Sequence, residues 1–143
     1  MLEREIEELL HEIVKINQMI VDTGDYSNLV SLCEQDISII SIVASNKNIT
    51  SKDISLVLQA PKTTIVSAVD RLTKKGYLVK EKDPNDGRRS WLNLTMLGEK
   101  ANKEHLDYEN KIIDFLVNCF DEDDQETLTT ILARRRKVKN ELL

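Results

Sequence analysis

The spacing of apolar residues predicts helices along most of the chain. The first segment, Glu3–Val21, repeats apolar residues every three or four positions, as an amphipathic helix does. A helix at the end of a chain needs a surface to dock on, because propensity alone does not hold it. A partner chain is one candidate for that surface. The apolar positions are Ile6, Leu9, Leu10, Ile13, Ile20 and either Val14 or Ile16.

Two helices joined by a short proline-containing turn are predicted in the middle of the chain. Ser51–Leu58 is preceded by Thr50, which with Asp53 resembles a capping box. Lys62–Lys75 follows, and Gly76 is placed to end it in a left-handed conformation. This order is that of a helix-turn-helix. The residues expected to be buried are Ile54, Val57, Leu58, Ile65, Ala68, Val69 and Leu72.

The pattern changes from helical to strand-like after Gly76. Tyr77–Lys82 and Ser90–Leu94 are predicted strands, and residues 83–87 between them are typical of a turn. Two strands around a turn, placed after a helix-turn-helix, predict a winged helix.

Further helices flank this module. One begins at Leu29 or Glu34 and ends near Ala44. Thr95 is a natural N-cap for a long helix from Met96 to about Phe120. A last helix, capped by Asp121, Asp123 or Asp124, runs to about Leu142. The expected fold is mainly α with a small β-wing: a winged helix-turn-helix over residues 29–95, flanked by helical regions at 1–28 and 96–143.

Charge is distributed unevenly along the chain. The net charge is −5, which alone argues against a nucleic-acid partner. However, the segment from Lys62 to Arg89 holds eight basic and four acidic residues, so it is positive within an acidic chain. A basic segment that coincides with a helix-turn-helix and its wing favours binding to DNA.

Several functional classes are not supported by the sequence. No apolar run reaches the roughly 18 residues needed to span a bilayer, and the N-terminal residues lack the apolar core of a signal peptide. We therefore expect a cytoplasmic protein with no membrane partner. The signature motifs of hydrolases, nucleotide-binding enzymes and metalloproteases do not occur, so we expect neither enzymatic activity nor a cofactor.

Cysteine and histidine residues are sparse. Cys33 and Cys119 are too few for a disulfide framework. Cys33 precedes a predicted helix, a position that favours a thiolate, but the adjacent acidic residues Glu34 and Asp36 oppose it. Cys119 lies among apolar residues and is expected in the core. A redox role for either thiol stays open. His11 and His105 stand alone, and a metal site needs three or four converging ligands, so no metal is expected.

Three short motifs, in this order and at these distances, resemble the MarR family of winged helix-turn-helix regulators. They are Val69–Leu72 (VDRL) with Gly76, then Asp86–Arg88 (DGR), then Leu94–Thr95 with Gly98. The flanking helices match that family's plan of one N-terminal and two C-terminal dimerisation helices. Two positions depart from the pattern: Pro61 and Ser67 stand where the family often has Ser and Arg.

The resemblance implies a homodimeric transcription regulator whose partner is double-stranded DNA. It implies an inverted-repeat operator, repression of transcription, and a small-molecule effector as an open possibility. The runner-up hypothesis is a winged helix that contacts another protein and has no operator. The expected dimerisation residues are Ile6, Leu10, Ile13, Leu128, Ile131 and Leu132.

The candidate DNA-binding residues come from three places. The start of Lys62–Lys75 is expected in the major groove, the wing arginines in the minor groove, and the start of Ser51–Leu58 near a phosphate. Val66 is suited to a thymine methyl group. Asp86 and Gly87 are expected to shape the wing. The candidates are Ser51, Lys52, Lys62, Thr63, Thr64, Val66, Ser67, Arg71, Arg88 and Arg89.

Overall fold

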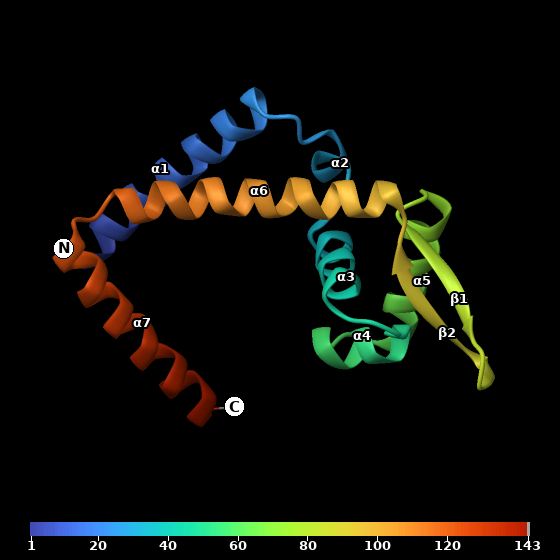
Figure 1. Cartoon of the computed structure of the whole chain (residues 1–143). Helices are drawn as coiled ribbons and strands as arrows, with labels where there is room; N and C mark the ends of the chain where they lie inside the picture. The colour runs from blue at the N-terminus through green and yellow to red at the C-terminus, as the bar shows by residue number, and fades with distance from the viewer. Residues whose placement is uncertain (143) are drawn as a thin grey trace. The chain divides into compact units, whose positions relative to one another are not determined.

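A computed structural model describes the backbone of residues 1–142 and the side chains of residues 1–136, so Leu143 lies outside the described residues. The described chain is mainly helical, with one two-stranded antiparallel sheet, as predicted (Figure 1). In chain order the elements are α1 (Leu2–Thr23), α2 (Ser27–Val30), α3 (Glu34–Ser45), α4 (Ser51–Leu58), α5 (Lys62–Lys74), β1 (Leu78–Asp83), β2 (Asp86–Leu94), α6 (Met96–Asn118) and α7 (Glu122–Leu142).

The chain divides into two compact units. Val21–Tyr108 is the first, called here the winged-helix unit. Met1–Ile20 and the residues from Glu109 onward form the other, called here the terminal unit. The first half of α6 therefore groups with the winged helix rather than with the chain termini.

The core of the winged-helix unit lies where α3, α4, α5 and the sheet meet. Ile39, Ile54 and Ile65 come from the three helices and have no exposed surface, and Leu92 from β2 is 1% exposed. The prediction for Val57 was wrong: its side chain is 62% exposed. Helix α4 has eight residues and packs on the core with one side only. Ile54 and the half-buried Leu58 cover that side, so Val57 is left facing solvent.

Helix α2 was not predicted, because four residues are too few to show a helical period. A long-range contact holds it. The buried carboxylate of Glu104, on α6, accepts hydrogen bonds from the backbone N–H groups of Asn28 (3.1 Å) and Leu29 (3.0 Å). Those amides lie in the first turn of α2 and would otherwise lack partners.

The wing is a tight antiparallel hairpin. Its register runs from Leu78 opposite Leu94 to Lys82 opposite Ser90. Strand β2 is longer than predicted, since it begins at Asp86, and the turn shrinks to residues 84–85. Two aspartate side chains stabilise this short turn by hydrogen bonds to the backbone. The Asp83 carboxylate accepts a hydrogen bond from the Asn85 N–H at 2.8 Å, and the Asp86 carboxylate accepts one from the Arg88 N–H at 3.0 Å.

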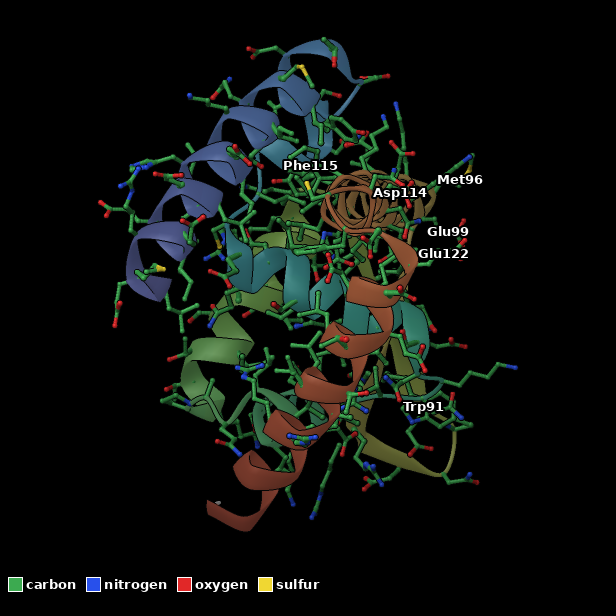
Figure 2. The ribbon with its side chains drawn as sticks, turned by 90° about the vertical axis from the view of Figure 1, so that its left-hand side faces the viewer. Trp91, Met96, Glu99, Asp114, Phe115 and Glu122 are labelled. Atoms are coloured by element: carbon green, nitrogen blue, oxygen red, sulfur yellow. The ribbon has the colours of Figure 1, made fainter. Side chains whose placement is uncertain are left out.

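The connection from the wing to α6 is closely packed. Thr95 caps α6 as predicted, because its Oγ1 accepts the Gly98 N–H at 3.1 Å. A Cβ at Gly98 would lie 2.2 Å from the carbonyl oxygen of Tyr77, so only glycine fits between the two segments. By contrast, Met96 projects outward in the first turn of the helix and is 88% exposed (Figure 2).

The terminal unit buries few of its described side chains. Ile20 alone is buried there. Cys119 is exposed, so its expected core position was wrong for the single chain. No described helix is both long enough and apolar enough to cross a membrane. The large apolar residues left exposed in the described part of this unit are Met1, Leu2, Ile6, Leu10, Val14, Met19, Ile113, Val117, Ile131 and Leu132.

Candidate nucleic-acid interface

A hollow of about 660 Å³ lies between the start of α4, the first turns of α5 and the wing. It is contained entirely within the winged-helix unit. Residues far apart in sequence meet there, since β2 returns beside the helix-turn-helix. We call this feature the basic hollow; its lining residues are Thr50, Ser51, Lys52, Asp53, Leu56, Lys62, Val66, Lys80, Arg88, Arg89, Ser90 and Leu92.

Cations dominate the lining of the basic hollow. Lys52 and Lys62 come from the two helices, and Arg88 and Arg89 come from β2. Lys80 also lines it, but its Nζ lies 2.5 Å from the Asp70 carboxylate, so its charge is partly compensated. Cations gathered in a concave surface concentrate a positive potential that attracts an anionic partner.

The start of α4 adds to this positive potential. The capping box is confirmed: the Asp53 N–H donates to Thr50 Oγ1 at 3.3 Å, and the Thr50 N–H donates to the Asp53 carboxylate at 2.9 Å. Hydrogen bonds from Thr50 hold the pKa of Asp53 below its usual value, and Arg89 and Lys52 act in the same direction. The helix therefore begins at the hollow, with the positive end of its dipole there.

Helix α5 presents a polar side outward because its apolar side is fully used. Ile65, Val69 and Leu72 have no exposed surface. The exposed side carries Lys62, Thr63, Thr64 and Ser67, with Val66 partly buried. Pro61 is the N-cap and provides no side-chain hydrogen bond. The first-turn N–H groups of α5 are thus left for another partner.

Six of the ten candidate residues are brought together in the basic hollow. They are Ser51, Lys52, Lys62, Val66, Arg88 and Arg89. Thr63, Thr64 and Ser67 are exposed on α5 but do not line it.

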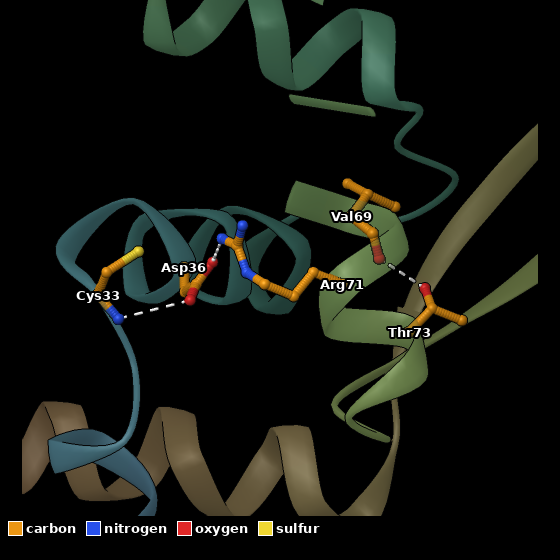
Figure 3. Close-up of polar contacts among 5 residues, drawn as sticks. All are labelled: Cys33, Asp36, Val69, Arg71 and Thr73. Atoms are coloured by element: carbon orange, nitrogen blue, oxygen red, sulfur yellow. Dashed lines mark hydrogen bonds and ion pairs between the residues drawn. The ribbon is translucent and has the colours of Figure 1, made fainter. Parts of the chain in front are cut away.

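The remaining candidate, Arg71, does not line the basic hollow and has a different environment. Its guanidinium forms an ion pair with the carboxylate of Asp36 on α3 (Figure 3). The Asp36 side chain is 3% exposed and that of Arg71 is 44% exposed. The hydrogen bond and charge of Asp36 raise the pKa of Arg71. Arg71 thus neutralises a buried carboxylate and ties α5 to α3.

Cys33 lies at the same point of the fold. It is the N-cap of α3, its side chain is exposed, and its backbone N–H donates to the Asp36 carboxylate at 3.4 Å (Figure 3). The thiol is also among the groups that raise the pKa of Arg71. Within the described residues, no group of three or more His, Cys, Asp or Glu side chains is placed to hold a metal ion.

Asp86 contributes to the shape of the wing through a hydrogen bond to the backbone. Its carboxylate accepts the backbone N–H of Arg88, and no ion pair joins the two side chains in the described part of the chain. Consequently the Arg88 guanidinium is available to a partner. Lys80 and Leu56 were not singled out from the sequence; Lys80 was one lysine of a basic run, and Leu56 one apolar residue of a short helix.

The sequence of the winged-helix unit matches a known family. Residues 34–89 match the profile of the MarR family. The matched segment contains α4, α5, β1 and the first residues of β2, and thus most of the basic hollow.

Curated relatives and solved structures are similar to this chain over most of its length. It is 26% identical over 115 residues to the HTH-type transcriptional regulator FarR of Neisseria gonorrhoeae, which covers 80% of the chain and 79% of FarR. Its fold is similar to that of Streptococcus pneumoniae FabT in complex with DNA, with a TM-score of 0.78, 14% identity and coverage of 99% and 97%.

A further similar structure is that of S. aureus MepR bound to ethidium bromide. The TM-score is 0.72 and the identity 17%, and the match covers 96% of each chain. At sequence identities of 14% and 17%, these two structural similarities show a shared fold and nothing more specific. The named relatives and the family itself are transcription regulators rather than enzymes.

The two ion pairs of α5 should differ in their contribution to stability. We expect Arg71→Ala to lower the free energy of unfolding by about 2–4 kcal/mol, because it leaves the buried Asp36 carboxylate without its cation. Lys80→Ala should cost less than about 1 kcal/mol, since both partners of that pair are substantially exposed. Urea unfolding of the two variants measures the difference, and equal costs would contradict the role given to Arg71.

Proposed function

We propose that this chain is a cytoplasmic, homodimeric transcription regulator that binds specific double-stranded DNA. The observation that carries this proposal is the basic hollow, where the two helices of the helix-turn-helix and the wing present cations on one surface. Its cations come from three segments of an otherwise acidic chain. A protein does not need to gather cations from three segments on one surface in order to be soluble, so this arrangement favours an anionic partner.

Each part of the surface suits a different part of a duplex. The exposed start of α5, with Lys62, Thr63 and Ser67, fits a major groove, where the N-terminal residues of a recognition helix reach base edges. Arg88 and Arg89 on the wing suit the negative potential of a narrow minor groove. The N-terminal amides of α4, near Ser51 and Lys52, suit a backbone phosphate.

A second copy of the chain is the partner proposed for the terminal unit. Apolar side chains such as Ile6 (48% exposed), Leu10 (57%) and Ile131 (53%) are too numerous there to be left in water in a stable protein. Leu132 extends the same set, and Ile13 and Leu128 are partly buried neighbours on the same helices. We assign dimerisation to the terminal unit, which lies within the flanking helical regions 1–28 and 96–143 predicted from the sequence. A two-fold dimer reads an inverted repeat with half-sites about 10 bp apart or a multiple of it.

Salt dependence should separate DNA binding from a winged helix that contacts only proteins. Neutralising phosphates releases counterions, so affinity for a duplex chosen from a random library should fall steeply between about 50 and 200 mM salt. Arg88→Ala should weaken binding about tenfold and reduce the log–log salt slope by about one. Fluorescence anisotropy measures both quantities.

Lys100→Ala is the matched control for that experiment, since Lys100 is exposed on α6 and does not line the basic hollow. Its affinity and salt slope should stay at the wild-type values. If the two variants weaken binding equally, the wing assignment is wrong. If no duplex is enriched from the library, the proposed function is wrong.

Charge placed on the apolar surface of the terminal unit should separate the dimer. We expect wild-type protein to sediment at twice the chain mass of 16.4 kDa and Leu10→Glu to sediment as the single chain, because a buried carboxylate would oppose association. Val30→Glu, a change at a 65% exposed position of α2, should leave the dimer intact. A wild-type monomer at micromolar concentration would refute the dimer.

Repression and ligand release complete the proposal. A dimer bound across a promoter would exclude RNA polymerase, and a ligand would release it by binding preferentially to a state that does not fit DNA. The structural neighbour MepR has been solved bound to ethidium bromide, which is a reason to test small molecules for release of this chain from DNA. We expect added protein to reduce in vitro transcription from a promoter that carries the enriched site. An increase in transcript would instead identify an activator.

A further inference from the structure

Helices α4 and α5 present the same two-residue pattern to the basic hollow. On α4, Lys52 is followed one turn later by Leu56; on α5, Lys62 is followed one turn later by Val66. All four side chains line the hollow. Residues four apart lie on one face of a helix, so each helix offers a cation and an apolar group side by side.

Leu56 is the unusual member of this set. Its side chain is 68% exposed, and it lines a hollow to which five cationic side chains also contribute. It lies opposite the core side of α4, which is anchored by the fully buried Ile54. Exposed leucines are common singly, but here an apolar residue of a second helix, Val66, lines the same cationic surface.

Phosphates and sugars do not require apolar partners, since lysine, arginine and helix amides satisfy them. The apolar group that a duplex exposes in its major groove is the C5-methyl of thymine. A methyl placed between two apolar side chains loses its contact with water, which stabilises the complex by roughly 0.8 kcal/mol, or about fourfold in affinity. Neighbouring lysines would hold the duplex at the distance needed for this contact.

We propose that Leu56 and Val66 together form a thymine-methyl contact and determine one base of each half-site. The inference rests on the proposed function, since it needs a duplex in the basic hollow. It goes further by giving a sequence-reading role to the first helix of the helix-turn-helix through Leu56. The operator should then contain, in each half-site, a thymine whose recognition depends on its methyl group.

Replacing thymine by uracil tests this contact, because dT and dU pair identically and differ by that methyl alone. In a duplex enriched from a random library, each dT is replaced by dU in turn and the dissociation constant is measured for the full-length protein. One position per half-site should weaken wild-type binding about fourfold. Leu56→Ala and Val66→Ala should bind the dT duplex more weakly and should no longer distinguish dT from dU.

Val57→Ala is the matched control. Val57 is adjacent to Leu56 and similarly exposed, at 62%, but does not line the hollow. This variant should keep the wild-type discrimination, and thermal unfolding should show that all variants are folded. If wild-type protein binds the duplex but tolerates dU at every position, the methyl contact is refuted while the proposed function stands. If no duplex is bound at all, both fail.

Discussion

Repulsion among the cations of the basic hollow is the constraint under which the winged-helix unit is built. Lys52, Lys62, Arg88 and Arg89 would separate if they were held by flexible segments. They stay together because buried residues of the same elements meet in one hydrophobic core: Ile54 of α4, Ile65 of α5 and Leu92 of β2. The hydrophobic core thus maintains an arrangement of charge that is unfavourable until an anion is bound.

The motifs that resemble the MarR family mark this supporting structure rather than the surface that would read DNA. Val69 and Leu72 of the VDRL motif are core residues, Asp70 pairs with Lys80, and Arg71 neutralises Asp36. Thr95 caps α6, and Gly98 allows the Tyr77 carbonyl to approach. Family resemblance therefore predicts the scaffold well. The operator would depend on residues between the motifs, such as Leu56, Val66 and Ser67.

Local signals in the sequence predicted local structure closely. Helix α4 has the predicted bounds because the Thr50–Asp53 capping box and its hydrophobic pattern agree, and Thr95 caps α6 as expected. Long-range effects were the ones missed. Helix α2 depends on Glu104, which lies 76 positions from Asn28, and Arg71 depends on Asp36 on another helix. Neither partner is visible from spacing. Val57 is exposed because only one side of the short helix α4 packs against the core.

Pro61 has a consequence for the order of events when a ligand arrives. It is the N-cap of α5 and offers no side-chain acceptor, so the N–H groups of the first turn have no side-chain cap. A phosphate oxygen of an incoming ligand would accept hydrogen bonds from those N–H groups and so cap the helix. The bound phosphate would then cap the helix that binds it. The mobility of this first turn would therefore fall when the site is occupied.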